Sequence, residues 1–288
     1  MKSIVNKSIT LFEFLIEKYP DSPRTRIKKL LQSGNVWING RSVSLHSHLL
    51  NPGDEVIIKT PKAKSSANLP FPLLHEDRHV IVIDKPAGKP TSSIDGSISI
   101  QQIISEYLKN QSKGKQRAHV VHRLDKEVSG VLMFAKSEEI MDIIKDAWNE
   151  TEKHYFALVE GTPPYDEDTI KSWLTEDDKQ KVHSTQDRSH SKLAITHYKI
   201  IKRLKKYTLL DIKTDTGRKN QIRVHLSELG CPIVGDRKYG ASKEFIRRIR
   251  LHACSLSYPD PVNGKTITVN SPMPEGFLLI NPGDEHYK

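Results

Sequence analysis

The sequence predicts an α+β protein built from two domains. The strands expected in the larger domain do not alternate regularly with helices, which disfavours a parallel doubly wound sheet and favours a mixed, mainly antiparallel one. A chain of 288 residues is long enough for one large domain and one small one. The segment from Lys62 to Pro70 has the small, polar, proline-ended composition of a linker. We therefore predict a small domain over residues 1–60, a linker over 61–70 and a large domain over 71–288.

Composition and charge narrow the class of protein. The chain has no apolar stretch of 18 or more residues and no signal-peptide pattern at its start, so we expect neither a membrane span nor secretion. Its two cysteines lie outside any CxxC pair and fit a reducing cytoplasm. The formal net charge of +10 indicates a polyanionic partner. Residues 1–60 carry 9 Lys/Arg against 5 Asp/Glu, and residues 71–288 carry 34 against 30, a net of +4 in each. The small domain is therefore the expected electrostatic anchor.

Two helix signals open the small domain, and short strands follow. Thr10 and Glu13 have the spacing of a capping box, which predicts a helix through about Lys18. Ser22-Pro23 predicts the start of a second helix, and Gly34 its end. The expected strands are Val36–Ile38, which an Asn39-Gly40 hairpin turn joins to Arg41, and Val56–Ile58 after a turn at Pro52-Gly53-Asp54.

Cationic side chains gather on the second helix and the hairpin, and they are candidate RNA-binding residues. Two helices followed by small strands, with cations along the second helix, resemble the α-L RNA-binding domain of a small-subunit ribosomal protein over about residues 8–59. Such cations suit phosphate contacts, which position an RNA without reading its sequence. On charge pattern alone, a solvated charged face is an equally good interpretation. The residues are Arg24, Arg26, Lys28, Lys29 and Arg41.

The elements of the large domain follow from apolar runs and helical spacing. Val80–Ile83 is an expected buried strand that enters a turn, and a second strand over 130–135 follows the His122–Ser129 segment directly. Helical spacing runs from Ile100 to Leu108. We also expect strands at 154–160, 194–201, 207–214, 251–257 and 266–270, a helix capped by Ser137 with Ile140, Ile143, Ile144 and Ala147 on its core face, and a helix from about Gln221 to Leu229 that ends at Gly230.

The segment His122-Arg123-Leu124-Asp125 is the first candidate for chemistry. It lies between a strand-like run and a turn that ends at Gly130. A carboxylate beside a guanidinium keeps a depressed pKa and stays ionised at pH 7, as a base or nucleophile needs to be. From spacing alone, however, neighbouring Arg and Asp are more often a structural ion pair.

Four motifs in order resemble those of the RluA group of pseudouridine synthases, over about residues 71–275. The resemblance implies the pseudouridine synthase fold, with Asp125 as the essential carboxylate that acts on the target uridine. It implies that Tyr155 packs on the flipped base, that Arg218 pairs with the carboxylate, and that Arg123 helps to hold the displaced nucleotide. His122 and Arg223 belong to the same motifs and are expected to contact substrate. The motifs are 74–77 with 83–88, 122–136, 153–161, and 216–225 followed by Gly235-Asp236 and 251–253.

Two positions depart from the family pattern. Val128 stands where the family usually has threonine, so a hydrogen bond in this loop is in doubt. Asn220 stands where histidine is frequent, and its side chain is a candidate cap for the helix that starts near Gln221.

Other candidate sites are weaker. The pairs His119/His122 and His75/His79 lack further metal ligands, so we expect no metal. No phosphate-cradling glycine loop is present, and the isomerisation requires no cofactor. The acidic runs 166–168 and 176–178 are expected in solvated loops rather than in a glycosidase site.

The expected function is therefore the isomerisation of uridines to pseudouridine in structured RNA. The module in front and the basic surface favour large-subunit ribosomal RNA first and transfer RNA second. A noncatalytic RNA-binding protein of ribosome assembly and a base-releasing hydrolase are the alternatives from other classes. We expect no membrane partner, and no feature indicates an obligate protein partner.

Overall fold

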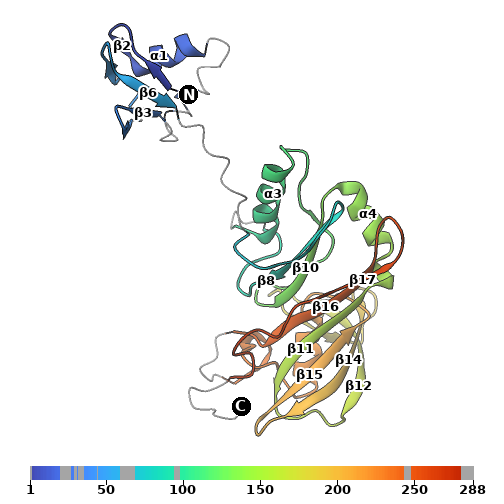
Figure 1. Ribbon diagram of the computed structural model, residues 1–288. Helices are drawn as coiled ribbons and strands as arrows, with labels where there is room; N and C mark the ends of the chain where they lie inside the picture. Colours follow the sequence, from blue (N-terminus) through green and yellow to red (C-terminus); the bar gives the residue numbers. More distant parts are fainter. Residues whose placement is uncertain are drawn as a thin grey trace. The chain divides into compact units, whose positions relative to one another are not determined.

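The structure is a computed structural model that describes residues 2–19, 27–28, 31, 36–43, 45–58, 69–93, 98–242 and 248–279. The chain divides into two compact units, Met1–Asn68 and Leu69–Lys288 (Figure 1). Within the described ranges, no helix has both the length and the apolar character that crossing a bilayer demands.

The front unit is built from short strands and a capped helix. The helix α1 (Leu11–Lys18) begins with the predicted capping box, in which the Thr10 side chain accepts from the Glu13 amide and Glu13 returns the bond. Asn39 and Gly40 both have positive φ (47° and 83°), as a two-residue hairpin turn requires. One sheet has the order β1 (Lys2–Ile4), β6 (Glu55–Ile58), β3 (Val36–Ile38), β4 (Arg41–Ser42), and β2 (Ile9–Thr10) pairs with β5 (Leu49–Leu50).

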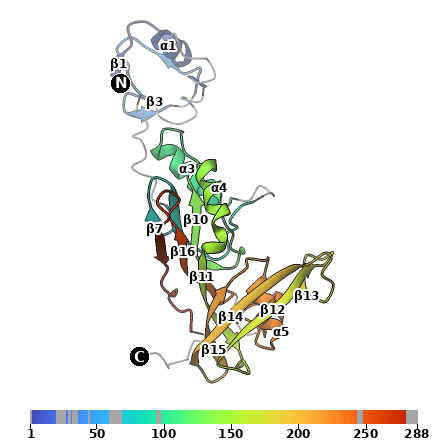
Figure 2. The ribbon, with the colours of Figure 1, turned by 90° about the vertical axis from the view of Figure 1, so that its right-hand side faces the viewer.

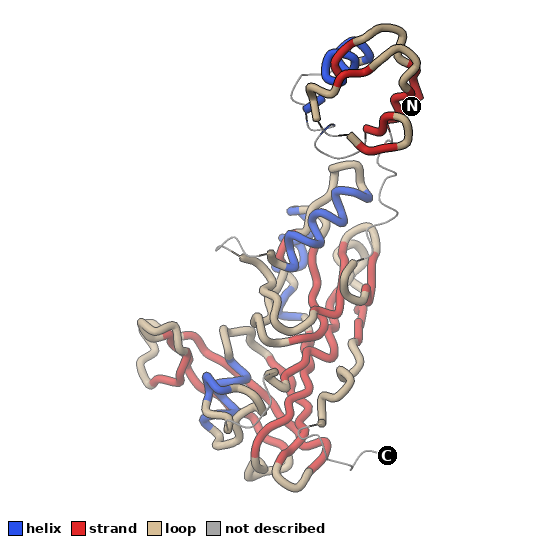
Figure 3. Tube along the Cα trace, turned by 90° about the vertical axis from the view of Figure 1, so that its left-hand side faces the viewer, coloured by secondary structure: helices blue, strands red, loops and turns tan. Residues whose placement is uncertain are grey.

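The second unit is organised around one large sheet, which runs through it in Figure 3. Every strand pair is antiparallel except β10 with β16, which confirms the expected mixed, mainly antiparallel sheet. The strand order is β13 (Val182–Thr185), β12 (Glu167–Glu176), β14 (Lys192–Arg203), β15 (Tyr207–Thr214), β11 (Glu152–Glu160), β16 (Leu251–Pro259), β10 (Ser129–Ala135), β8 (Val80–Lys85), β7 (Leu73–Glu76), with β17 (Thr266–Asn270) on β16 and β9 (His119–Val120) on β10.

Helices cover both faces of this sheet. Alternate residues of β8 and β10 pack in different clusters: Ile81 and Leu132 lie with α3 (Ile100–Gln111), and Val82 and Met133 lie with α4 (Glu138–Asp146). Alternation along a strand places these two sets on opposite faces, so α3 and α4 cover opposite sides of the same strands (Figure 2). The helix α5 (Gln221–Glu228) packs against β13 and β14 at the other end of the sheet.

A close backbone contact joins the two parallel strands. Gly130 of β10 faces Ala253 of β16, and a Cβ built on Gly130 would lie 2.1 Å from the Ala253 carbonyl oxygen. Its φ of +116° is also one that side-chain-bearing residues rarely adopt. This glycine therefore allows β10 to leave the preceding loop directly beside β16.

Two expectations are wrong. The acidic runs 166–168 and 176–178 are only partly in loops, because β12 spans Glu167–Glu176 and takes in Glu167, Asp168 and Glu176, while Asp177 and Asp178 lie in the turn after it. Ile143 is 40% exposed rather than in the core, because α4 buries Ile144 and packs Ile140 and Met141 along a narrower stripe. The other strands and helices expected in the large domain are confirmed, within a few residues at their ends.

Candidate active site

Asp125 lies in the loop between β9 and β10. The backbone that follows Asp125 is held by residues at and just after the end of β8. The buried Lys85 ammonium donates to the carbonyl oxygens of Lys126 (3.1 Å) and Val128 (2.7 Å), and the Gly88 amide donates to the Lys126 carbonyl as well (2.8 Å). The Val128 amide also donates to the Asp125 carbonyl (3.1 Å). The turn that follows β8 therefore fixes the course of the loop.

Lys85 is fully buried, and its charge is costly in that position. Burial lowers the pKa of its ammonium to about 8, although the negative charges of Glu127 and Asp125 oppose the shift. Three backbone carbonyls accept from Nζ, the third being that of Pro86 at 3.0 Å. A protonated ammonium has one donor for each of them.

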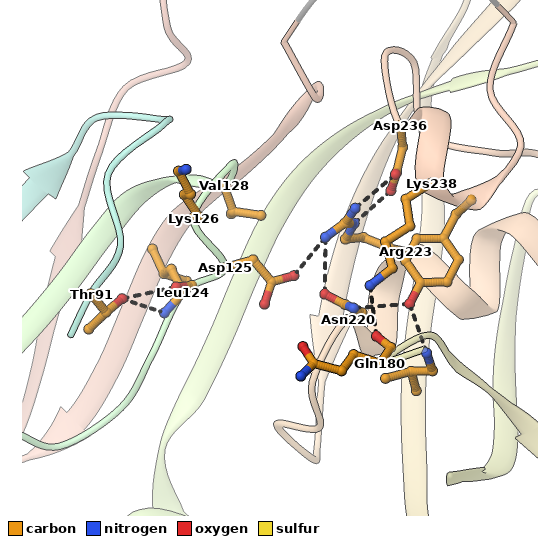
Figure 4. A network of polar contacts seen from close by, with 12 residues as sticks. Thr91, Leu124, Asp125, Lys126, Val128, Gln180, Asn220, Arg223, Asp236 and Lys238 are labelled. Atoms are coloured by element: carbon orange, nitrogen blue, oxygen red, sulfur yellow. Dashed lines mark hydrogen bonds and ion pairs between the residues drawn. The ribbon is translucent and has the colours of Figure 1, made fainter. Parts of the chain in front are cut away.

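A buried arginine contacts the candidate carboxylate. Arg223 of α5 donates from Nη1 to Asp125 Oδ2 at 3.3 Å and to Asn220 Oδ1 at 3.0 Å (Figure 4). Asp236 binds the other side of the guanidinium through two hydrogen bonds, from Nε at 2.6 Å and from Nη2 at 2.8 Å. The Tyr239 ring lies 5.0 Å from the guanidinium carbon. Asp236, itself 1% exposed, therefore fixes the arginine that meets Asp125.

The arginine assignment differs from the one that the resemblance implied. Arg218 does not contact Asp125: its Nε donates to the Leu193 carbonyl at 3.0 Å, and its amide donates to the Gln221 side chain. The physical reason is position, because Arg218 precedes α5 in an exposed loop, whereas Arg223 lies within the helix and is buried. Arg218 still lines the pocket around Asp125.

Tyr155 lines the same pocket from the central strand β11. A β-bulge occurs at this point, since His154 pairs with Ser255 and Tyr155 pairs with Ala253, which leaves Cys254 as the extra residue. Bulges of this kind redirect side chains beside active sites. Burial and then the charge of Asp125 raise the pKa of Tyr155 above its usual range, so the phenol is neutral at physiological pH.

Two adjoining pockets meet at Asp125, a small one that we call the inner pocket and a larger one that we call the outer groove. The inner pocket holds about 80 Å³, and Val128, Tyr155 and Ile222 are among its apolar and aromatic walls. The outer groove holds about 800 Å³ and shares Asp125, Arg223 and five other lining residues with the inner pocket. Seven Lys/Arg and three Asp/Glu line the groove, which gives it a positive field. Asp125 therefore lies where a small pocket with an aromatic wall adjoins a larger cationic groove.

His122 contacts residues of the protein itself and is not among those that line either pocket, so its expected contact with substrate stays a prediction. Its Nε2 accepts from the Met133 amide at 3.0 Å, and its ring stacks on Trp148 with 5.1 Å between centroids. Burial lowers the pKa of His122 to about 3, with a smaller contribution from Lys153. The imidazole is therefore neutral, and its Nε2 faces the Met133 amide of β10.

The remaining predicted residues have mixed outcomes. Arg123 is exposed and lines both the pocket and the groove. Val128 is buried at 3% exposure and forms part of the pocket wall. Asn220 occupies the N-cap position of α5 with φ of 54°, but its side chain does not cap the helix. Instead it donates to the Tyr239 hydroxyl at 3.0 Å and accepts from Arg223, so this expectation is wrong.

The proposed RNA-binding cations of the front unit are only partly described. Lys28 is helical and exposed, and Arg41 begins β4. Arg24, Arg26 and Lys29 lie outside the described residues. Over the parts of the chain that are described, no three His, Cys, Asp or Glu side chains gather as a metal ion would need.

The residues that hold Asp125 and Arg223 in place were not predicted from the sequence. Asp236 and Lys85 were noted only as members of motifs, and Tyr239 was not singled out. The available signal was a charged residue next to an apolar or glycine-containing stretch, as at Lys85, which follows four apolar residues and Asp84. Such a residue needs a partner when it is buried.

Comparison with known proteins decides the family. A model described as RNA pseudouridylate synthase matches residues 79–228, and one described as S4 domain matches residues 11–56. The chain belongs to the RNA pseudouridylate synthase family. The uncharacterized RNA pseudouridine synthase YlyB of Bacillus subtilis is 31% identical, over 95% of this chain and 93% of that protein.

Two further relatives carry more specific names. The ribosomal large subunit pseudouridine synthase D of Xanthomonas campestris is 29% identical, over 92% of this chain and 86% of its own. The ribosomal large subunit pseudouridine synthase C of Buchnera aphidicola is 31% identical, over 93% and 91%. Human RNA pseudouridylate synthase domain containing 4 shares the fold, with a TM-score of 0.62, 24% identity and coverage of 72% of this chain and 90% of that one.

Proposed function

We propose that this pseudouridine synthase isomerises specific uridines of large-subunit ribosomal RNA, with Asp125 as its catalytic carboxylate. The observation that carries the proposal is the position of Asp125, at the junction of a base-sized pocket and a cationic groove. The S4 match and the relatives named for the large ribosomal subunit support the choice of RNA.

Asp125 is available for the reaction because Arg223 engages only one of its oxygens. Oδ2 receives one hydrogen bond of 3.3 Å, and no donor among the described residues contacts Oδ1. The side chain is 30% exposed and faces the pocket. The guanidinium is saturated from the other side by Asp236, so it can steady the carboxylate without enclosing it.

The chemistry requires the base to leave the sugar and return. The C1′–N1 bond breaks, the uracil turns and C1′ bonds to C5; the C5 proton then passes to solvent, and N1 ends with a proton in its place. An ionised carboxylate serves this sequence either by attacking C1′ or by removing the C2′ proton. Tyr155 is the proposed platform for the detached base in the inner pocket. The target must first leave its stack, which costs roughly a few kcal/mol, and Arg123 and Arg218 at the rim are placed to hold its phosphates.

Mapping of pseudouridines in cells with and without this protein tests the choice of RNA. The proposal expects one or more sites in large-subunit ribosomal RNA to revert to uridine when the protein is absent. Loss confined to transfer RNA would favour the alternative substrate. Unchanged ribosomal RNA with altered ribosome assembly would favour the noncatalytic class.

Removal of residues 1–60 tests the role of the front unit. Because these residues carry a net charge of +4, their removal should weaken RNA binding and flatten its dependence on salt. An unchanged salt slope would contradict the role of electrostatic anchor. The matched comparison is the full chain with the same RNA, titrated over the same salt series.

A further inference from the structure

Thr91 makes an unusual pair of contacts with the residue that precedes Asp125. Its hydroxyl donates to the Leu124 carbonyl at 2.9 Å and accepts from the Leu124 amide at 3.2 Å (Figure 4). Thr91 is 2% exposed, and Leu124 is 7% exposed. One buried hydroxyl therefore satisfies both polar backbone groups of Leu124.

The backbone of Thr91 is anchored in turn on the first turn of α3. Its carbonyl accepts from the Gln101 amide at 3.0 Å, and the neighbouring Pro90 carbonyl accepts from the Ile100 amide at 3.0 Å. These amides belong to the first turn of α3, where helices have no internal acceptors for them. The helix itself is fixed in the core by fully buried residues, Ile100, Ile104 and Leu108.

The two flanks of Asp125 are held by different groups. On the C-terminal side, Lys85 and Gly88 hold the Lys126 carbonyl. On the N-terminal side, Thr91 holds Leu124. The Lys85 contact depends on a buried charge, whereas the hydroxyl of Thr91 does not titrate in the working range. Asp125 thus sits between two backbone positions that are fixed independently.

We propose that Thr91 is a positioning residue for the isomerisation, which holds Asp125 in line with the inner pocket through the backbone of Leu124. The inference rests on the proposed role of Asp125. Thr91 also lines the outer groove with Pro90 and Ser92, although its side chain is nearly fully buried. A misplacement of about 1 Å can slow an enzyme roughly 100-fold.

Hydroxyl removal at Thr91 tests the proposal. In Thr91→Val a methyl group replaces the oxygen and forces Leu124 away, so we expect the single-turnover rate constant to fall by about 10- to 100-fold. The Kd for RNA should stay within about twofold, because Arg123, Arg218 and the front unit are unchanged. Thr91→Ser keeps the hydroxyl and should restore the wild-type rate.

A matched control separates positioning from general stability. Thr208 is fully buried and donates to the Gly161 carbonyl at 2.7 Å, away from the pocket. Thr208→Val should lower stability and leave the rate constant unchanged. Should Thr91→Val not fold, Thr91→Ala removes the hydroxyl without adding bulk and should show the same split between rate and affinity in milder form.

The outcomes distinguish this proposal from the proposed function. A wild-type rate in both Thr91→Val and Thr91→Ala overturns the positioning role, as does an equal loss in Thr91→Ser and Thr91→Val. Loss of rate in Thr208→Val to the same degree would also overturn it. If wild-type protein forms no pseudouridine, or if Asp125→Asn remains active, the proposed function fails instead.

Discussion

Asp236 offers the sharpest test of how the site is held together. Asp236 is 1% exposed and forms two hydrogen bonds to Arg223, whose side chain is 8% exposed. In Asp236→Asn the shape is kept and the charge is lost, which leaves a buried guanidinium with Asp125 as its remaining anionic partner. We expect both stability and activity to fall.

The expected loss of unfolding free energy in Asp236→Asn follows from the contacts that Arg223 keeps. Breaking a buried ion pair by removing one charge costs about 3–5 kcal/mol. An asparagine oxygen can still accept one of the two bonds, and Arg223 keeps Asn220 at 3.0 Å and Asp125 at 3.3 Å. The loss should therefore lie near the lower end, about 3 kcal/mol. Freed from Asp236, the guanidinium should draw closer to Asp125 and slow the reaction.

Denaturant unfolding measures the loss of stability in Asp236→Asn, and single-turnover pseudouridine formation measures the loss of activity. The midpoint should shift while the slope with denaturant stays constant. Asp166→Asn is the matched control, because Asp166 also pairs with an arginine, Arg203, but is 79% exposed. Exposed pairs contribute little. If Asp236→Asn loses no more unfolding free energy than the Asp166→Asn control, the buried Asp236–Arg223 pair does not stabilise the site as proposed.

Three further predictions address other parts of the site. Gly130→Ala should prevent stable folding, since its Cβ would lie 2.1 Å from the Ala253 carbonyl oxygen, and a near-native melting temperature would contradict this. Lys85→Met removes the ammonium donor from the carbonyls of Lys126 and Val128, and the Lys126 carbonyl keeps only the Gly88 amide. It should lower the rate constant about 10-fold or more at constant RNA affinity, and a wild-type rate would count against it. His122 has a folded pKa of about 3, so the unfolded chain binds more protons between that value and about 6.5. The unfolding free energy of the wild type should therefore decline as pH falls through this window. It should decline less steeply in His122→Gln, whose side chain keeps an acceptor for the Met133 amide. Parallel pH profiles of the two proteins would contradict the buried, neutral state of His122.

Local sequence signals predicted much of the fold because their partners are close in the chain. The capping box of Thr10 and Glu13 spans four residues, and the Asn39-Gly40 turn joins adjacent strands. The strand β12 was not predicted because its exposed residues are polar, and because its first three residues are all exposed and so show no alternation of burial. A strand of this kind is defined by its neighbours in the sheet rather than by its own pattern.

Asp125 could be predicted from motifs, but the residues that hold it in place could not. Arg218 and Arg223 share one motif, and only the start and rotation of α5 decide which of them reaches Asp125. Asp236 lies 13 residues beyond Arg223, and Thr91 lies 33 residues before Leu124. Contacts across such distances depend on the packing of separate elements, which periodicity and spacing do not specify.

The central claim is that Asp125 catalyses the isomerisation of uridine. Ribosomal RNA labelled with tritium at C5 of uridine measures it directly, because formation of the new C1′–C5 bond releases that label. We expect release by wild-type protein without free uracil, and none by Asp125→Asn, which should still bind RNA. Free uracil from the wild type would indicate a base-releasing hydrolase, and tritium release by Asp125→Asn at the wild-type rate would contradict the role of Asp125.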